Sequence, residues 1–214
     1  DTIARKQASA QGRRVKREFA GGSEQTRMTA LRPLIDVRNL AVSFAIPGGS
    51  VPALSGVSFR IRPGSVVAVV GESGSGKSVT AQAIMGILPR IGRIDSGEIL
   101  FTDPKTQRTV DLATLPPRSE AFRTVRGARL SMIFQEPMTS LSPLHKVGAQ
   151  IGEVIEIHEG LHGEAVEKRV VDMLRLVRFP DPERGFKSYP FELSGGLRQR
   201  AMIAMALVCK PVLL

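Results

Sequence analysis

The sequence has few of the residues on which several classes of binding site depend. It contains no tryptophan and one tyrosine, and aromatic residues make up 5% of its 214 positions. Its lone cysteine, Cys209, excludes an internal disulfide framework and suits a reducing cytosol. The histidines have no metal-ligand spacing with that cysteine and are interpreted as surface or core residues: His145, His158 and His162.

Long hydrophobic runs are also absent. The longest, Ala201 to Cys209, is far too short to span a bilayer. A hydrophobic share of 42% is still enough for a substantial core. The net charge of +10 is compatible with nucleic-acid binding. The scarcity of aromatic residues and the lack of an RNA-stacking motif instead favour anionic lipid headgroups and general solvation.

A glycine-rich loop lies between a predicted strand and a predicted helix. The apolar, β-branched run Ser65 to Val70 predicts a buried parallel strand. Val79 to Leu88 predicts a helix that ends at Pro89. Between them, Gly71 to Ser78 reads Gly-Glu-Ser-Gly-Ser-Gly-Lys-Ser, which is a phosphate-binding P-loop in the context that this motif requires. The sequence therefore predicts nucleotide binding.

The residue types of this loop suit phosphate chemistry. Gly74 and Gly76 let backbone N–H groups turn toward the β-phosphate with no Cβ in the way. The helix N-terminus adds a favourable field for anions. Lys77 is expected to reach the β- and γ-phosphates, and the hydroxyl of Ser78 to ligate Mg²⁺.

A second glycine-rich turn opens the last predicted helix. Leu197 to Cys209 is apolar through most of its second half, which predicts a buried helix with Ser194 as its N-cap. The Ser194 hydroxyl and the amides that follow it form a second potential anion site. A capped core helix with a glycine turn is the plainer alternative. Because Ser194 follows Ser78 by 116 positions (194 − 78), one chain need not place both motifs around one phosphate.

The two motifs together resemble the ATP-binding cassette (ABC) ATPases, whose signature motif begins Leu-Ser-Gly-Gly; here Leu193 to Arg200 reads Leu-Ser-Gly-Gly-Leu-Arg-Gln-Arg. The resemblance implies an α/β fold, with a P-loop NTPase core, an antiparallel β subdomain and an inserted α-helical subdomain. It implies ATP and Mg²⁺ as cofactors, and a dimer in which the signature of one subunit closes on the ATP held by the other. The nucleotide-binding residues that it implies are Phe44, Gly71, Ser73, Gly74, Ser75, Gly76, Lys77, Ser78, Val79, Ser194, Gly195 and Gly196.

The resemblance also gives roles to two residues outside these motifs. Leu130 to Phe134 predicts a short apolar strand, and Gln135 follows it. A glutamine in this place contacts Mg²⁺ and the attacking water in ABC ATPases, so Gln135 is expected to serve catalysis and metal binding; an ordinary loop glutamine is the alternative. Phe44 corresponds to the family's adenine-stacking aromatic residue, with a strand core residue as the equal alternative.

Further segments are similar to the ATPases of peptide, nickel and opine importers: Met132 to Leu141, Val147 to Ile151 and Tyr189 to Ser194. The similarity runs from about Leu34 to Leu214. It implies transmembrane permease partners, a second ATPase subunit in a homo- or heterodimer, and indirectly a periplasmic or extracellular solute-binding protein, with no nucleic acid. The implied location is the cytoplasmic face of the bacterial inner membrane, as a peripheral protein.

Strand and helix patterns fit this architecture. Leu34 to Ile46 and Val57 to Ile61 alternate as antiparallel strands do, and Ser96 to Phe101 predicts another strand before a polar insertion at 102–117. Two amphipathic helices are also predicted. Their apolar faces are Val147, Ile151, Val154 and Ile155, and Val166, Val170, Met173, Leu174 and Val177.

The domain boundaries follow from charge and motif placement. Residues 1–27 carry seven basic and three acidic side chains with no hydrophobic segment after them, and are interpreted as a disordered basic extension. Residues 28–214 are expected to form the nucleotide-binding domain, with a helical subdomain at about 137–197. Lys210 to Leu214 resembles the start of the strand that carries the family's catalytic Asp and Glu. The domain is therefore expected to be C-terminally incomplete and nearly inactive in hydrolysis by itself.

Three functional hypotheses remain open. The leading one is the ATP-binding subunit of an ABC importer that drives uptake of peptides or similar small solutes, docked on permeases through the loop around Ser140 to Gln150. The second is a soluble ABC-type ATPase acting on nucleic acid or the ribosome. The lack of coiled-coil heptads between the motifs argues against it. The third is a non-catalytic nucleotide-binding fragment.

Overall fold

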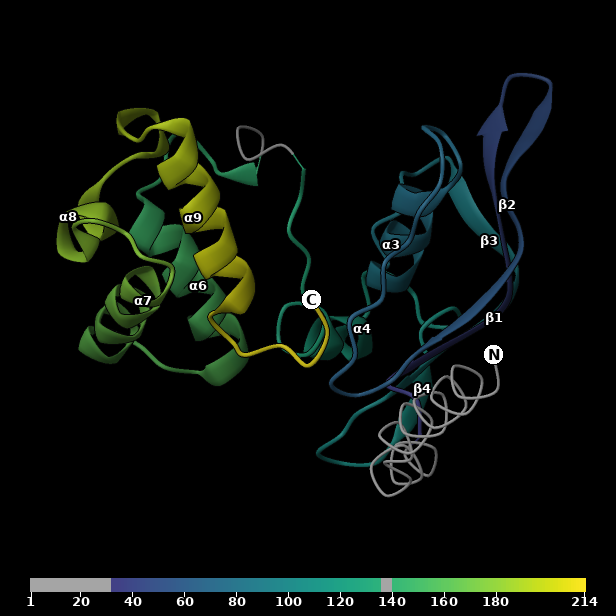
Figure 1. The fold of residues 1–214 in the computed structure, drawn as a ribbon, viewed down its shortest axis with the longest axis horizontal. Coiled ribbons are helices and arrows are strands. Elements are labelled where there is room, and N and C mark those ends of the chain that lie inside the picture. The colour runs from purple at the N-terminus through teal and green to yellow at the C-terminus, as the bar shows by residue number, and fades with distance from the viewer. Residues whose placement is uncertain (1–31, 136–139) are drawn as a thin grey trace, which may run out of the picture.

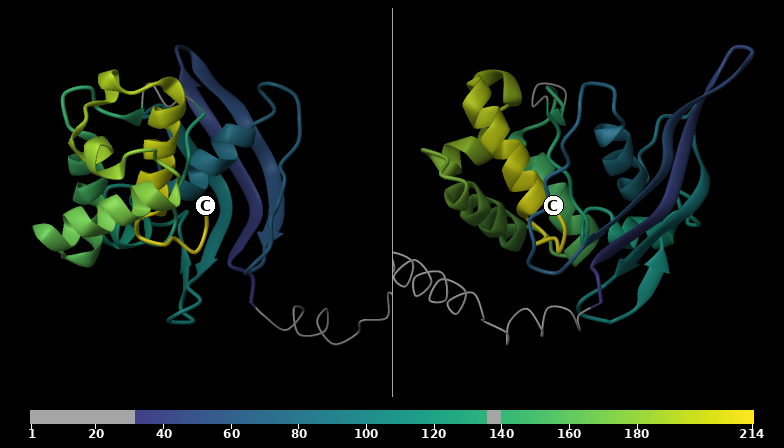
Figure 2. Two further views of the ribbon diagram at one scale, coloured as in Figure 1. Left: turned by 60° about the vertical axis from the view of Figure 1, so that its left-hand side comes forward. Right: turned by 45° about the vertical axis from the view of Figure 1, so that its right-hand side comes forward.

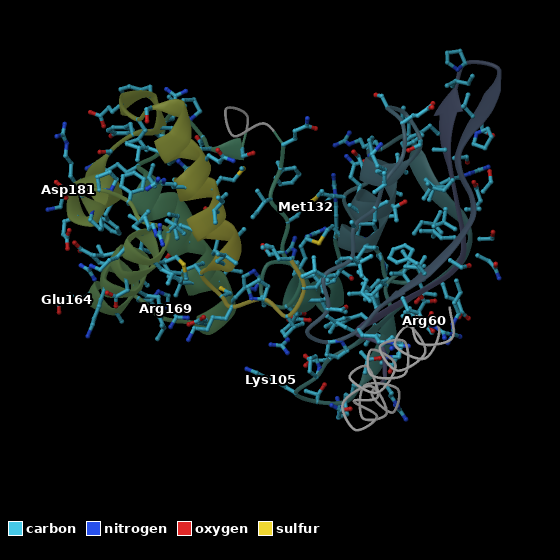
Figure 3. All side chains as sticks on the ribbon, in the orientation of Figure 1. Arg60, Lys105, Met132, Glu164, Arg169 and Asp181 are labelled. Carbon is cyan, nitrogen blue, oxygen red and sulfur yellow. The ribbon has the colours of Figure 1, made fainter. Side chains whose placement is uncertain are left out.

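A computed structural model describes residues 32–135 and 140–214. These residues form two lobes (Figure 1), one built on an antiparallel sheet and the other entirely of helices. The views in Figure 2 keep the same separation. The segment that joins the lobes carries Met132, which lies between them (Figure 3). The predicted disorder of residues 1–27 falls outside the described residues.

The sheet has four strands in the order β2-β1-β3-β4. Strands β1 (Ile35–Ile46) and β2 (Gly49–Ile61) form a hairpin, in which Gly48 takes a positive φ of 85° at the turn. On its other edge β1 pairs with β3 (Gly92–Thr102), which pairs with β4 (Thr109–Asp111). All three pairings are antiparallel, as predicted for β1 to β3.

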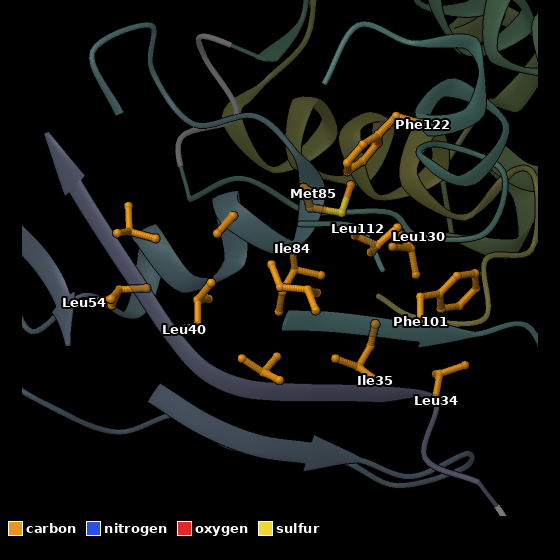
Figure 4. Close-up of a cluster of buried hydrophobic side chains, with 14 residues drawn as sticks. Leu34, Ile35, Leu40, Leu54, Ile84, Met85, Phe101, Leu112, Phe122 and Leu130 are labelled. Atoms are coloured by element: carbon orange, nitrogen blue, oxygen red, sulfur yellow. The ribbon is translucent and has the colours of Figure 1, made fainter. Parts of the chain in front are cut away.

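One face of this sheet is covered by two helices. Helix α3 (Lys77–Met85) follows the P-loop, and α4 (Glu120–Val125) has Ser119 as its N-cap. Figure 4 shows their apolar side chains packed on the inner face of β1 and β3. Burial of this apolar surface is the main stabilising contribution to the lobe. The most deeply buried members are Ile35, Val37, Leu40, Val42, Ile99, Leu112, Phe122 and Leu130.

The prediction of a buried parallel strand at Ser65 to Val70 is wrong. The segment is extended but forms no strand, and Val66 and Val70 are 100% and 91% exposed. Within the described residues, no backbone group of residues 66–70 hydrogen-bonds to another backbone group. A strand needs a neighbour to pair its backbone groups, and none of the described residues pairs with this segment. An apolar groove separates it from the segment that leads to Gln135.

The predicted strand Leu130 to Phe134 is reduced to isolated bridges. Leu130 bridges in parallel to Arg126 and to Leu213, and the N–H of Ser131 donates to the carbonyl of Leu213 at 3.0 Å. The residues that follow are irregular, and Phe134 is exposed. The last residues of the chain therefore pair with the start of this segment.

The helical lobe contains four α-helices and one short 3₁₀ turn among the described residues. They are α6 (Val147–Glu159), α7 (Glu164–Leu176), α8 (Pro182–Lys187), η1 (Pro190–Glu192) and α9 (Gly195–Leu207). The two predicted amphipathic helices are confirmed, because their apolar faces meet in one core. Its fully buried members are Val147, Ile151, Ile155, Val170, Leu174, Ala201, Ala204 and Val208.

A close contact ties the lobes together beside α4. Gly127 has a φ of 88°, and a Cβ built at this position would lie 2.5 Å from Nε2 of His158 on α6. Burial lowers the pKa of His158. Only glycine accepts both the backbone conformation and the imidazole ring here.

Within the described segments, no helix is both long and apolar enough to cross a membrane.

Candidate nucleotide site

The P-loop lies where α3 begins, at the exposed edge of the sheet lobe. Gly74 and Gly76 have φ values of 81° and 89°, a region that residues with a Cβ rarely adopt. Gly76 also packs tightly on β2, since a Cβ there would lie 2.5 Å from Cδ2 of Leu54 and 3.0 Å from the carbonyl oxygen of Ala53. The two predicted phosphate-binding glycines are therefore required by the backbone itself.

Lys77 closes the loop on itself. Its Nζ donates to the carbonyl oxygens of Gly71 and Glu72, at 2.7 and 2.5 Å, and to Oγ of Ser75 at 3.3 Å. These contacts hold the ammonium against oxygens of the loop, where an anion could replace them as its partner. A phosphate can therefore meet a cation that is already positioned.

The first turn of α3 presents unsatisfied donors. Gly76 is the N-cap and supplies no side-chain oxygen to the helix amides. Ser73, Ser75 and Ser78 are exposed, so their hydroxyls are accessible to a ligand, while Val79 is half-buried. Thr80 anchors the turn from the inside, because its Oγ1 donates to the carbonyl of Gly76 at 3.0 Å. Uncapped amides, accessible hydroxyls and the helix dipole together favour an anion.

Phe44 lies on β1 and is half-buried. Two positions before it, Val42 pairs with Leu54, the residue that touches Gly76. The Phe44 ring covers Gly92 of β3, where a Cβ would lie 2.8 Å from Cε1. The side chain thus packs in the sheet against the start of β3. Its role as an adenine stacker stays a prediction.

Gln135 is exposed at the far end of the segment between the lobes. The base of this segment is held by Arg129, which donates two hydrogen bonds to Asp103, at 2.7 and 2.9 Å. Burial raises the pKa of the Asp103 carboxyl, but the bonds from Arg129 and from backbone amides outweigh it and hold that pKa low. The carbonyl of Arg129 accepts from the N–H groups of Val212 and Leu213.

The second glycine-rich turn lies on the helical lobe, at the start of α9. Ser194 is its N-cap, as predicted, and its Oγ accepts from the N–H of Leu197 at 3.4 Å. Gly195 and Gly196 have open space where a Cβ would lie. Upstream, Oε2 of Glu192 accepts from the N–H of Tyr189 at 2.7 Å and fixes the approach to the turn. This site and the P-loop lie on different lobes of the chain (Figure 1).

The sequence analysis did not identify the residues that hold the segments around these motifs in place. The pairing of Arg129 with Asp103 spans 26 positions, and the contact of Gly127 with His158 joins two lobes. Local patterns give no indication of such distant partners. Thr80 alone carried a usable signal, because threonine four residues after a helix start commonly donates back to that carbonyl.

A comparison with known families agrees with this geometry. Residues 54–214, which are more than half of the chain, match the ABC transporter family. The chain belongs to the ABC transporter family. The expected ABC ATPase fold is thereby confirmed, and the roles of the P-loop and signature residues stay predictions.

Curated proteins of similar sequence are named as transport ATP-binding proteins, for peptidoglycan, oligopeptides or dipeptides. The chain is 51% identical over 187 residues to the peptidoglycan transport ATP-binding protein YejF of Agrobacterium fabrum, covering 87% of this chain and 33% of that protein. It is 48% identical over 188 residues to the oligopeptide transport ATP-binding protein OppD of Bacillus subtilis, covering 87% and 50%. The dipeptide transport ATP-binding protein DppD of the same organism is 46% identical, with 86% and 53% covered. The chain thus spans about half or less of these relatives.

Solved ABC cassettes share the fold. One is a dimeric structure of the ATP-binding cassette MJ0796 in a post-hydrolysis state bound to ADP and Pi. It superposes with a TM-score of 0.69 at 25% identity and covers 83% of this chain and 70% of that one. A second dimeric structure of MJ0796, described as a bacterial ABC transporter cassette, gives the same TM-score at 26% identity.

Proposed function

We propose that this chain is the nucleotide-binding part of an ABC importer ATPase that drives uptake of peptides or similar small solutes. The observation that carries the proposal is the P-loop, in which Lys77 is held over loop carbonyls at the uncapped start of α3. Family membership and the printed names of the relatives support the transport role.

The residues present fit Mg-ATP. Lys77 would hold the terminal phosphates, with N–H groups of the P-loop around them. The exposed Ser78 hydroxyl and the Gln135 amide would supply oxygen ligands to Mg²⁺, which prefers oxygen donors. Bound Mg²⁺ would neutralise charge that develops on the phosphates. Gln135 would orient the attacking water through its neutral amide.

A dimer would complete the site. Ser194, Gly195 and Gly196 lie on the helical lobe, away from the P-loop of the same chain (Figure 1). An uncovered turn of this kind can bind a phosphate held by a second subunit. The dimeric state of the related cassette MJ0796 supports this arrangement, as either a homo- or a heterodimer. The second subunit would therefore supply the signature motif.

The loop before α6 is suited to contact a permease. Gln150 ties it down: its Oε1 accepts from the N–H of Ser142 at 2.8 Å, and its Nε2 donates to the carbonyls of Ser142 and His145. The held loop presents Leu144, which is 81% exposed. A rigid loop with an exposed leucine loses little entropy when a partner covers it. Docking on a permease would place the protein on the cytoplasmic face of the bacterial inner membrane.

Binding of Mg-ATP to the 214-residue chain tests the nucleotide site. We expect an affinity in the micromolar range or weaker, abolished by Lys77→Ala, because no other cation is held in the loop. Lys105→Ala, which removes an exposed lysine on the turn after β3, is the matched control and should bind as the parent does. Isothermal titration measures both. Equal binding by the Lys77→Ala variant refutes the proposal.

Hydrolysis and the signature are tested together. We expect negligible turnover from the chain alone, and a kcat near ~1 s⁻¹, ordinary for enzymes, would contradict this.

In a dimeric ABC ATPase that contains this domain, Ser194→Arg should leave ATP binding intact and block hydrolysis and transport. Loss of nucleotide binding in the isolated chain carrying Ser194→Arg would show that the turn does not act on a partner's nucleotide.

Co-purification separates the remaining alternatives. The importer hypothesis predicts that the protein fractionates with membranes that contain a permease. A soluble ATPase of nucleic acid or the ribosome would instead retain RNA or DNA, which absorbance at 260 nm detects. Recovery of nucleic acid without membrane association would overturn the importer assignment.

A further inference from the structure

The valine run, which we define as residues 66–70, exposes both its backbone and its side chains. None of its N–H or C=O groups bonds to another backbone group among residues 32–135 and 140–214. All five residues are exposed, and Val66 and Val70 keep 100% and 91% of their surface accessible. An uncovered apolar stretch of extended backbone is a template for pairing with a strand of another chain.

The side chains of the valine run divide between two sides. Val67 and Val69 line the apolar groove that α3 borders, and they are 44% and 57% exposed. Val66 and Val70 lie on the opposite side, because side chains alternate along an extended chain. Substitutions at these two outer positions therefore disturb little packing within the chain.

The composition of this segment favours pairing between strands. Residues 65–70 read Ser-Val-Val-Ala-Val-Val and contain no charge, proline or glycine. β-Branched residues suit a pleated strand, and short uncharged segments of this kind are those that pair between chains. Such pairing would satisfy the backbone groups that the described chain leaves open.

The order of the residues makes the valine run complementary to itself. It reads Val-Val-Ala-Val-Val in both directions, with Ala68 at its centre. When two copies lie antiparallel about a two-fold axis at Ala68, position 66 of each faces position 70 of the other, and position 67 faces position 69. Every valine then meets a valine of the other copy, and the two alanines meet at the axis.

Charges at the two ends of the run select the antiparallel direction. Arg62 precedes the run and Glu72 follows it, and both are exposed. Neither forms an ion pair within the described parts of the chain. Antiparallel pairing brings the arginine of each copy toward the glutamate of the other, whereas parallel pairing brings like charges together.

We propose that two copies of this chain associate through the valine run, as antiparallel strands related by a two-fold axis at Ala68. A second copy suits the run better than an unrelated strand, because symmetry supplies both the matching valines and the opposite charge at each end. This contact is distinct from the nucleotide-dependent dimer proposed above, since neither Lys77 nor the Ser194 turn takes part in it.

The association is expected to be weak. Its Kd should be on the order of 100 µM, because five paired residues form an interface smaller than those of stable complexes. The chain is then monomeric in dilute solution and paired in concentrated solution. Sedimentation velocity over a range of protein concentrations, without nucleotide, measures this equilibrium.

Two charge variants at the outer positions test the register. Val66→Lys/Val70→Lys puts lysine opposite lysine in both outer pairs and should weaken association about tenfold or more. Val66→Lys/Val70→Glu removes the same two valines but puts lysine opposite glutamate, and should associate within about threefold of the parent. Both positions are exposed, and thermal melts check that both variants are folded.

A cysteine at the axis provides an independent test. In a Cys209→Ser background, Ala68→Cys would place two thiols directly opposite, where facing Cα atoms are about 4.5–5.5 Å apart and within disulfide reach. Val66→Cys in the same background is the control, because its two thiols would lie four positions apart, at roughly 13 Å. We expect copper phenanthroline to cross-link the first variant and not the second, as a non-reducing gel shows.

Several results would overturn the proposal. These are a parent chain that stays monomeric well above the expected Kd, equal losses in the two charge variants, or equal cross-linking at positions 66 and 68. Species larger than a dimer that grow with time would show open-ended stacking instead of a closed pair. Ser194→Arg should leave this association unchanged, so a failure here and a failure of the nucleotide-dependent dimer are distinguishable.

Discussion

The two lobes differ in how completely their backbones are paired. In the helical lobe the amides beyond the first turn of α6, α7 and α9 bond within their own helices, and Ser194 and Asp181 cap helix starts with side-chain oxygens. In the sheet lobe the four antiparallel strands are paired, yet the valine run before the P-loop remains exposed and unpaired.

The difference follows from where each element finds its hydrogen-bond partners. A helix pairs each N–H with a carbonyl four residues earlier, so it needs only its own sequence and one apolar face to bury. A strand needs another strand at its side. The run at 66–70 has the composition of a strand interior but no backbone partner among residues 32–135 and 140–214, and its valine side chains remain exposed.

The largest expected effect compares two truncations to alanine. Ile151→Ala, at a fully buried position of α6, should lower the free energy of unfolding by about 2–5 kcal/mol through lost burial and a cavity. Val66→Ala, at a fully exposed position, should change it by less than about 0.5 kcal/mol. Urea denaturation followed by circular dichroism measures both. Similar losses from the two variants would show that the valine run is buried in solution.

Substitutions at two glycines test the contact between the lobes. Gly127 and Gly160 both have positive φ, but a Cβ would meet His158 only at Gly127. Gly160→Ala should cost about 1 kcal/mol for the left-handed backbone alone. Gly127→Ala should cost about 1–3 kcal/mol more, the usual range for overpacking.

A double variant identifies the cause of that difference. Adding His158→Ala to Gly127→Ala should recover most of the extra loss, because the imidazole is the group that the new methyl would strike. The free energies of unfolding of the two single variants and the double variant give the coupling. Additive losses would mean that the ring is not the obstacle.

The smallest effect is an acid response of the sheet lobe. Burial raises the pKa of the Asp36 carboxyl, but bonds from Arg38 and Arg60 at 2.8–3.0 Å outweigh it and lower that pKa from 3.8. The stabilisation is therefore complete above pH 3.8 and is lost as the pH falls through the lower folded-state pKa. Asp36→Asn should lower stability at pH 7 and flatten this acid dependence. Urea titrations at several pH values measure the free energy of unfolding of both proteins. If Asp36 were not responsible, this free energy would fall with decreasing pH as steeply in Asp36→Asn as in the parent.

Much of the fold and of the site was accessible to sequence reasoning. The P-loop glycines, the Ser194 cap and the faces of α6 and α7 were predicted, because each depends on residues close together in the chain. The strands of Ser65–Val70 and Leu130–Phe134 were predicted wrongly from the same kind of pattern. Both segments are apolar, and the first is also β-branched, but pairing depends on distant segments.

What the sequence by itself determined was the local chemistry: a phosphate-binding loop, a capped glycine turn and helices with one apolar face. The backbone conformation of neighbouring residues and the spacing of apolar residues along the chain decide these features. Only the tertiary structure decided that Arg129 holds Asp103 and that His158 fills the space beside Gly127. It also decided which apolar segments became strands, because a backbone hydrogen bond between strands joins residues that the sequence separates.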